Sequence, residues 1–197
     1  MKLKDISRLC AKSHEICICD MRGAQWLGNG HAMYPVFGLP ELDVDTAPAV
    51  LDFNEEKAEA LDVRNVYLED RYNMREADDY EEALTGVVLR FLHGGGQLDA
   101  WRTESGCIVL IDPIYTKPYF ADDAAVPTLY LRRRDNGDNY VIGKSGMFVT
   151  AIITPEEPDA KTADDLADKF RRLAVAMTAA GTAVPVDPAT GEVLKNG

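Results

Sequence analysis

The stretch from Pro127 to Pro155 constrains the fold of this chain more than any other part of the sequence. Its turn pair, Asn136-Gly137, lies between two segments that are rich in β-branched and aromatic residues, and this pattern is typical of a β-hairpin. A second turn with two glycines, at residues 143–146, leads into an apolar segment at residues 147–154. The stretch therefore predicts three consecutive antiparallel strands.

Two details of this meander can be predicted from charge and from periodicity. A loop of only two residues at Asn136-Gly137 would set Asp135 against Asp138, and directly opposed like charges are destabilising, so we expect a wider loop. The segment at residues 147–154 is largely apolar on both sides, which indicates a strand inside a sheet that is covered on both faces. Pro155 ends this strand, because proline cannot donate to the hydrogen-bond ladder.

The rest of the chain repeats the pattern of strands that are joined by turns. Strands are expected at residues 15–20, 24–27, 31–34, 97–103 and 107–111. Residues 83–92 fit a strand or a helix, and their β-branched and aromatic side chains favour a strand. Helices are expected at residues 3–12, near 47–52, from Asn54 as N-cap to Leu61, and from Thr162 to Gly181.

This order predicts an α+β fold, in which an antiparallel sheet of hairpin meanders has helices packed on one face. At 197 residues, of which 46% are hydrophobic, the chain is long enough to bury a substantial core. We expect a single domain at residues 1–181 that includes a charged, irregular arm at about residues 62–82. A mobile C-terminal tail is expected at residues 182–197.

Neither a membrane span nor a signal peptide is predicted. No apolar run approaches the ~18 residues that a membrane-spanning helix needs. Charged residues, among them Lys2, Lys4 and Asp5, interrupt the first segment, so it lacks the apolar core of a signal peptide. We therefore expect a cytoplasmic protein that does not contact a membrane.

No motif specifies a catalytic residue, a cofactor or a metal. The cysteines lack CxxC spacing and a disulfide framework, so buried reduced thiols are favoured over a metal site at His14, Cys17 and Cys19. His31 could act as a general base, but no nucleophile motif accompanies it, and a structural histidine is favoured. Asp43 and Asp45 could bind a divalent cation, and capping of the following helical turn is favoured instead.

Basic residues are grouped in spite of a net charge of −12, which disfavours unspecific binding to nucleic acid. Grouped cations in an acidic protein suit phosphate contacts, whereas ordinary solvated faces are the alternative. Arg132, Arg133 and Arg134 crowd the end of one expected strand. The candidate DNA-contacting residues lie on the first and last helices: Lys4, Arg8, Lys12, Lys169, Arg171 and Arg172.

Two stretches resemble parts of bacterial DNA polymerase sliding clamps. WLGNGHAMYP, from Trp26 to Pro35, is similar to a strand and DGHRLA segment of the clamps. CIVLIDPIYTKPYF and the following meander are similar to the clamp pattern that ends in Met-Pro, with Tyr115 and Pro155 in the corresponding positions. The departures are Ala32 for the first basic residue of DGHR, Thr154 for the final methionine, and a length far below that of a three-domain clamp protomer.

The whole chain also resembles an uncharacterised family of small proteins encoded in phages and prophages of Gram-positive bacteria, which share the segment QWLGxGxAMYP. This resemblance implies a phage-related origin and carries no known activity. Our leading hypothesis is a non-enzymatic accessory protein of phage origin that is sliding-clamp-like or DNA-processing. It would be a homo-oligomer with its basic helix faces toward DNA.

Two other functions stay open. The first is a protein–protein interaction module that binds a host or phage protein through the aromatic loop with Tyr34, Phe37 and Leu39 and through the acidic arm. The second is a small hydrolase-like enzyme around His31 and the pair Asp43 and Asp45.

Overall fold

The computed structural model describes residues 3–68, 71–120, 128–158, 163–164 and 166–172. The chain divides into two units, Met1–Glu156 and Glu157–Gly197. Glu156, the last residue of the first unit, forms an isolated β-bridge opposite Leu110. The expected single domain at residues 1–181 stays a prediction. The tail expected at residues 182–197 lies outside the described residues.

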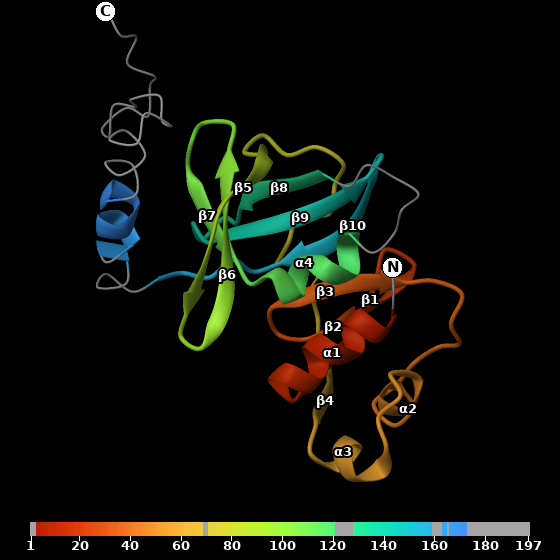
Figure 1. The fold of residues 1–197 in the computed structure, drawn as a ribbon. Helices are drawn as coiled ribbons and strands as arrows, with labels where there is room; N and C mark the ends of the chain where they lie inside the picture. The colour runs from red at the N-terminus through yellow and green to blue at the C-terminus, as the bar shows by residue number, and fades with distance from the viewer. Residues whose placement is uncertain (1–2, 69–70, 121–127, 159–162, 165, 173–197) are drawn as a thin grey trace, which may run out of the picture. The chain divides into compact units, whose positions relative to one another are not determined.

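The first unit contains a sheet of ten strands and the helices that cover it (Figure 1). The helices are α1 (Leu3–Ser13), α2 (Ala47–Val50), α3 (Glu55–Glu59) and α4 (Pro113–Phe120). The strands are β1 (Glu15–Met21), β2 (Ala24–Gly28), β3 (Ala32–Val36), β4 (Asp62–Asn65), β5 (Glu82–His93), β6 (Gly96–Thr103), β7 (Ile108–Ile111), β8 (Thr128–Arg133), β9 (Asn139–Ser145) and β10 (Phe148–Ile153).

The strands follow the order β4-β1-β2-β3-β10-β9-β8-β5-β6-β7 across the sheet. Every pair is antiparallel except β1 with β4, which is parallel. The described residues therefore form a mixed fold of helices and strands that is mostly antiparallel sheet, which agrees with the α+β prediction. A likeness to a clamp domain stays a prediction. The N-terminal strands join the C-terminal meander in this sheet where Met33 of β3 pairs with Ile152 of β10.

The meander β8-β9-β10 confirms the interpretation of the stretch that ends at Pro155. The loop between β8 and β9 spans five residues, 134–138, and is wider than two residues as expected. The Arg134 amide donates to the Asp138 carbonyl at 2.8 Å, and Gly137 takes a positive φ of 92°. The next turn is narrower than expected, because β9 continues through Ser145, which pairs directly with Phe148.

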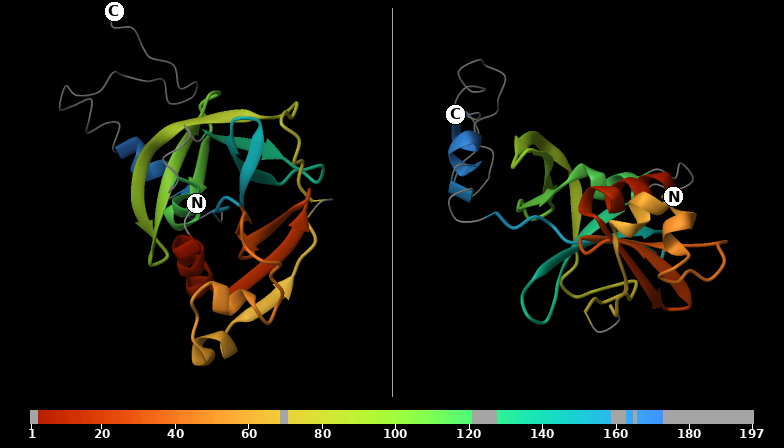
Figure 2. Two further views of the ribbon diagram at one scale, coloured as in Figure 1. Left: turned by 90° about the vertical axis from the view of Figure 1, so that its right-hand side faces the viewer. Right: turned by 90° about the horizontal axis from the view of Figure 1, so that it is seen from below.

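One face of the sheet is covered by helices, and we call the buried residues there the helix-face core. Ile6, Leu9 and Cys10 of α1 are buried against alternate strand residues such as Ile16 and Ile18. The helices α1 and α4 contact each other as well as the sheet, so they lie on the same side of it (Figure 2). Tyr119 of α4 donates its hydroxyl proton toward the carbonyls of Lys144 at 2.6 Å and Thr128 at 3.0 Å.

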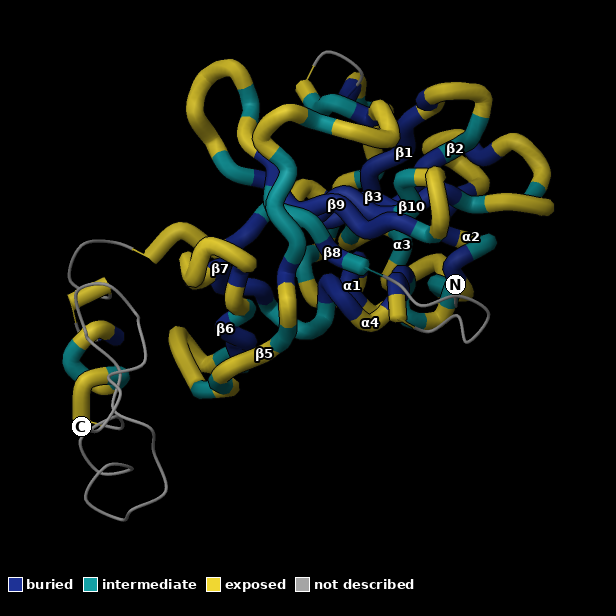
Figure 3. Tube along the Cα trace, turned by 90° about the horizontal axis from the view of Figure 1, so that it is seen from above, coloured by how far each residue is buried: buried dark blue, intermediate teal, exposed yellow. Residues whose placement is uncertain are grey.

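The opposite face is covered by the charged arm, which the sequence analysis describes as an irregular segment at about residues 62–82. Its first four residues form β4, and the remaining arm, residues 66–68 and 71–81, crosses the sheet. Leu68 and Met74 are buried against Cys17, Trp26 and other residues of what we call the arm-face core. Burial on both faces encloses β3, most of β9 and the second half of β10 (Figure 3), whereas Phe148 at the start of β10 is exposed.

The second unit is described in part. Residues 163–164 and 166–172 are helical, with Leu166 buried and Phe170 partly buried. The expected caps of this helix, Thr162 and Gly181, lie outside the described residues. Within the described part of the chain, no helix combines the length and apolar character that crossing a bilayer requires.

Candidate functional site

The arm is fastened to the sheet by Arg132 of β8, whose side chain is 0% exposed. Its guanidinium donates to the carbonyls of Asn73 at 2.7 Å, Arg75 at 3.0 Å and Glu76 at 3.0 Å. The same guanidinium binds the Glu81 carboxylate, with Nε at 2.7 Å from Oε2 and a second, shorter contact from a terminal nitrogen. One buried side chain thereby fixes the path of the arm from residue 73 to residue 81.

Lys144, on the neighbouring strand β9, supports the same anchor. Its ammonium group donates to the Glu76 carbonyl and to the second carboxylate oxygen of Glu81. The ammonium nitrogen also lies 4.4 Å from the ring centroid of Tyr130, within the range of a cation–π interaction. Glu81 therefore neutralises one of two largely buried cations, and the carbonyls of the arm and the tyrosine ring stabilise the rest of the charge.

An aromatic contact holds the arm near residue 72. The ring of Tyr72 meets that of Tyr140 edge-on, with 5.1 Å between centroids. The Tyr140 hydroxyl oxygen accepts a hydrogen bond from the Asn73 amide at 3.1 Å. Arg134 lies with its Cζ atom 4.4 Å from the Tyr72 centroid and donates to the Tyr72 hydroxyl at 2.7 Å. Burial raises the pKa of Tyr140, so this hydroxyl stays protonated at neutral pH.

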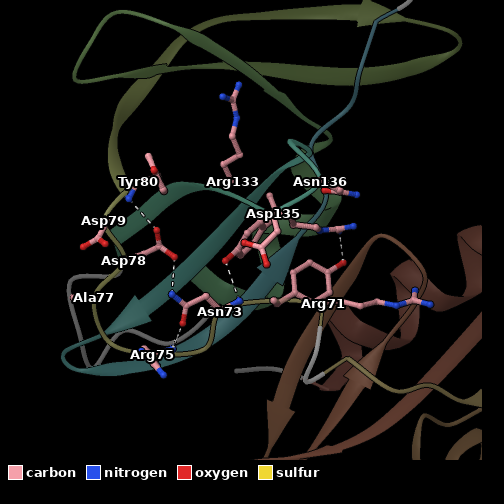
Figure 4. Close-up of a pocket in the computed structure, with 13 residues that line it drawn as sticks. Arg71, Asn73, Arg75, Ala77, Asp78, Asp79, Tyr80, Arg133, Asp135 and Asn136 are labelled. Carbon is pink, nitrogen blue, oxygen red and sulfur yellow. Dashed lines mark hydrogen bonds between the residues drawn. The ribbon is translucent and has the colours of Figure 1, made fainter.

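Between the arm and the β8–β9 loop lies an open pocket of about 830 Å³, shown in Figure 4. Four arginines line it, two from the arm, one from the end of β8 and one from the β8–β9 loop: Arg71, Arg75, Arg133 and Arg134. Three tyrosines and three aspartates complete the charged and aromatic lining: Tyr72, Tyr80, Tyr140, Asp78, Asp79 and Asp135. The lining carries a net charge of +1 in a chain whose total is −12.

The arginines of the pocket differ in how far they are already engaged. Arg134 is partly buried, and its guanidinium lies 3.7 Å from the Asp138 carboxylate. Arg71, Arg75 and Arg133 are exposed, and their side chains make no ion pair within the part of the chain that the structure describes. In Figure 4 these three side chains leave the ribbon at different sides of the pocket. They form a basic rim rather than a single convergent cluster.

Among the acids that line the pocket, Asp78 is already engaged in hydrogen bonds. Asp78 accepts hydrogen bonds from the Asn73 side-chain amide at 2.6 Å and from the Tyr80 backbone amide at 2.9 Å, so it serves to shape the arm.

The described residues contain no group of three or more His, Cys, Asp or Glu side chains that could hold a metal ion. Exposed guanidinium groups around an open pocket suit the binding of an anionic ligand.

The basic residues predicted on the first helix are partly neutralised. Arg8 lies 3.2 Å from Asp5, and Lys12 lies 2.6 Å from Asp112. Lys4 is exposed and makes no ion pair with a described residue. The first helix therefore offers a weaker basic stripe than its sequence suggests.

The last helix shows the same effect. Arg171 lies 3.5 Å from Asp168 and Arg172 lies 2.7 Å from the same carboxylate, whereas Lys169 is exposed. The two groups of basic residues lie in different units of the chain. DNA contact by either group stays a prediction.

The residues predicted to bind a protein partner are divided by burial. Tyr34 is fully buried in the helix-face core, where its hydroxyl donates to the Tyr115 carbonyl, so its side chain cannot reach a partner. Phe37 is 74% exposed, and it lines a small pocket together with Leu39. The partner-binding hypothesis is corrected to Phe37 and Leu39.

The His31 ring and the Asp43 carboxylate make contacts within the fold. The His31 ring stacks on Tyr115, with 5.7 Å between ring centroids. The Asp43 carboxylate accepts from the Thr46 hydroxyl and amide, both at 2.8 Å, and from the Asp45 amide at 3.0 Å. The bonds from Thr46 lower the pKa of Asp43. Asp43 therefore organises the turn before α2, which is the interpretation that the sequence favours.

The cysteines are not joined by disulfides, and three of them, Cys10, Cys17 and Cys19, are buried as expected. Burial raises the pKa of Cys10 to about 12 and that of Cys17 to about 11. The fourth, Cys107, is exposed, because it lies in the turn before β7 and not in the strand where the sequence analysis places it.

The three consecutive arginines at residues 132–134 are evident in the sequence, but the pocket is not. A usable signal is strand alternation, since Leu129 and Leu131 on one face imply Tyr130 and Arg132 on the other. A strand that is covered on both faces must then bury Arg132, and a buried guanidinium requires an acid. Comparisons of the chain with protein-family models, curated proteins and solved structures found no match.

Proposed function

We propose that this protein is a non-enzymatic accessory protein that binds nucleic acid. The observation that carries the proposal is the basic rim of the pocket, where Arg71, Arg75 and Arg133 are exposed and unpaired among the described residues. Buried Arg132 and Lys144 hold the arm that presents two of these arginines, so the rim is positioned before any ligand binds. The phosphate contacts are assigned to this rim ahead of the two helix faces.

The resemblance to sliding-clamp segments and to phage-encoded proteins supports a role in the processing of phage DNA. In the clamp-like form of the proposal, several copies of the chain close a ring, so a homo-oligomer is required. Analytical ultracentrifugation tests this form, and a strict monomer at micromolar concentration would argue against the ring while leaving nucleic-acid binding open.

Fluorescence anisotropy of labelled DNA at low salt tests the proposal. We expect binding that weakens steeply as the salt concentration rises, because counterions are released when arginines contact phosphates. The double variant Arg75→Glu/Arg133→Glu should abolish the signal. Its matched control, Lys4→Glu/Arg8→Glu, changes the net charge equally and should weaken binding much less.

Two results would contradict this assignment. Absence of DNA retention at low salt contradicts the function itself. Loss of binding in the Lys4→Glu/Arg8→Glu variant, with binding intact in the Arg75→Glu/Arg133→Glu variant, returns the contact surface to the helix faces.

A protein-binding role of the loop around Phe37 is the second candidate, because a 74% exposed phenylalanine beside a pocket is typical of an interaction anchor. In this case Phe37→Ser should leave DNA binding unchanged and abolish capture of a phage or host protein on an affinity column. Equal capture by the Phe37→Ser variant would remove this candidate.

A further inference from the structure

Tyr80 distinguishes the pocket from an ordinary basic surface. Its side chain is 76% exposed, and it lines the same pocket as Arg75 and Arg133. A large aromatic ring in this position gains nothing from core packing. It is available for contact with a ligand that also meets the arginines.

The backbone on both sides of Tyr80 is held in place. The Tyr80 amide donates to Asp78 at 2.9 Å, and the next residue, Glu81, is bound by Arg132 and Lys144. The ring is therefore exposed on a fixed main chain. A ring presented in this way loses little conformational entropy when a flat partner stacks on it.

The other two tyrosines of the pocket are already engaged. Tyr72 and Tyr140 contact each other edge-on, and Arg134 lies over Tyr72. They form the wall of the pocket, whereas Tyr80 offers its ring to solvent. Tyr80 is therefore the side chain of this lining that suits stacking.

An exposed aromatic ring among arginines can contribute to the binding of single-stranded nucleic acid much more than to the binding of a duplex. In a duplex the bases are stacked inside and present mainly phosphates and groove edges, so an isolated aromatic ring adds little. In a single strand the bases can turn outward and stack on aromatic side chains, and each stacked base contributes about 1–3 kcal/mol.

The modest net charge of the lining strengthens this distinction. Three aspartates reduce the charge of four arginines to +1, so phosphate contacts alone give weak binding. We propose that the pocket binds single-stranded nucleic acid, with one base stacked on Tyr80 and the flanking phosphates on Arg75 and Arg133. This inference rests on the proposed function and specifies its ligand.

Anisotropy titrations with four probes test it: a short thymidine homopolymer, the equivalent uridine homopolymer, a duplex of the same length and an abasic oligonucleotide. We expect the single strands to bind at least ~10-fold more tightly than the duplex and the abasic probe, because they alone supply exposed bases. Binding of either homopolymer supports the inference, and their ratio tells whether DNA or RNA is preferred.

The variant Tyr80→Ala should weaken single-strand binding about 5- to 150-fold, which corresponds to the loss of one stacked base. Duplex binding should not change, and Tyr80→Phe should restore single-strand binding because the ring remains. Phe37→Ala is the matched control, since it removes an equally exposed ring away from the pocket lining.

The outcomes separate this inference from the proposed function. Equal affinity for duplex and single strand, with no effect of Tyr80→Ala, overturns the single-strand inference and leaves nucleic-acid binding intact. Absence of binding to every probe overturns both. Displacement of the thymidine homopolymer by polyglutamate at equal charge concentration also overturns the inference, because the pocket would then recognise negative charge without bases.

Discussion

The two faces of the sheet are covered in different ways. On the helix face, α1 and α4 bury apolar side chains such as Ile6 and Leu9 against the strands. On the arm face, an irregular segment without regular secondary structure is held by Arg132 and Lys144 through one carboxylate and several backbone carbonyls. The first cover depends mainly on apolar area, whereas the second combines the burial of Leu68 and Met74 with polar contacts made in one geometry.

This difference has a physical consequence for the site. Apolar burial is non-directional and tolerates small shifts of the covering helix. A buried guanidinium is stabilised only when its donors find acceptors, so it enforces one path of the arm. The pocket is built on the arm, and the rigidity of the pocket therefore depends on Arg132 more than on the apolar core.

The largest effect is expected from Arg132→Met. It removes the buried guanidinium and its hydrogen bonds to the carbonyls of Asn73 and Arg75. The Glu76 carbonyl and the Glu81 carboxylate are left with Lys144. Loss of one partner of a buried ion pair lowers the free energy of unfolding by about 3–5 kcal/mol. Urea denaturation followed by far-UV circular dichroism measures this value.

Arg133→Met is the matched control, because Arg133 is the exposed neighbour of Arg132 in the same strand. Its effect on stability should stay within about 0.5 kcal/mol. If Arg132→Met leaves the free energy of unfolding unchanged, the arm does not need the guanidinium. The contrast between the two faces would then be wrong.

The contrast also explains how far the sequence predicts the fold. Strands β1, β2 and β3 and the meander β8-β9-β10 follow from turn glycines and β-branched residues, which act locally. Helix α1 follows from an apolar stripe of the correct period. The pairing of Met33 with Ile152 joins segments that are far apart in sequence, and no local pattern encodes it.

The arm and the pocket are harder to predict for the same reason. Strand β4 has one apolar residue, Val63, and its pairing with β1 depends on backbone hydrogen bonds that composition does not reveal. The arm lacks apolar periodicity, and donors on β8 and β9 help to set its position. Arg71 and Arg75 line the same pocket as Arg133 because the arm that carries them is bound by Arg132.

Thiol reactivity can measure the opening of the two faces of the sheet separately, because buried cysteines lie on both faces. Cys10 belongs to the helix-face core and Cys17 to the arm-face core. Burial raises the pKa of Cys17 from 9.0 to about 11. This rise lowers its thiolate fraction about 100-fold at pH 8, and alkylation slows accordingly, because the thiolate is the reactive form.

Iodoacetamide labelling followed by peptide mass spectrometry measures the rates. Exposed Cys107 should react first, and Cys10, whose pKa is about 12, should react last. In the Arg132→Met variant the rate at Cys17 should rise more than the rate at Cys10. Equal acceleration of both would mean that the two faces open together.

A moderate effect is expected on the helix face from Gly143→Ala. A Cβ atom at this position would lie 2.5 Å from Cε2 of the Tyr119 ring, and the hydroxyl of this tyrosine is bound to two carbonyls. Overpacking of this kind costs about 1–3 kcal/mol of unfolding free energy. Thermal or urea denaturation measures the loss.

The Tyr119→Phe background tests this explanation. Phenylalanine keeps the ring but releases it from the carbonyls of Thr128 and Lys144, so the ring can move away from the added methyl group. The cost of Gly143→Ala should therefore be smaller in Tyr119→Phe than in the native chain. An unchanged cost would place the strain in the strand and not in the contact with Tyr119.

The smallest effect is expected at the ion pair between Lys12 and Asp112, which ties α1 to the residue before α4 at 2.6 Å. Lys12 is largely exposed, so water and salt screen the attraction, and Lys12→Met should cost about 0.2–1 kcal/mol. Asp112→Asn is the matched change, because it removes the charge and keeps an oxygen that can accept the Ile114 amide bond.

A double-mutant cycle over Lys12→Met and Asp112→Asn, measured by urea denaturation, isolates the coupling between the two charges. If helix α1 is held by apolar burial, this coupling stays below about 1 kcal/mol and vanishes at high salt, because exposed charges are screened. A coupling comparable to the cost of Arg132→Met would mean that the helix face also depends on a polar tie. Both faces would then be held by ion pairs, and the dependence on a strong ion pair would no longer distinguish the arm from the helices.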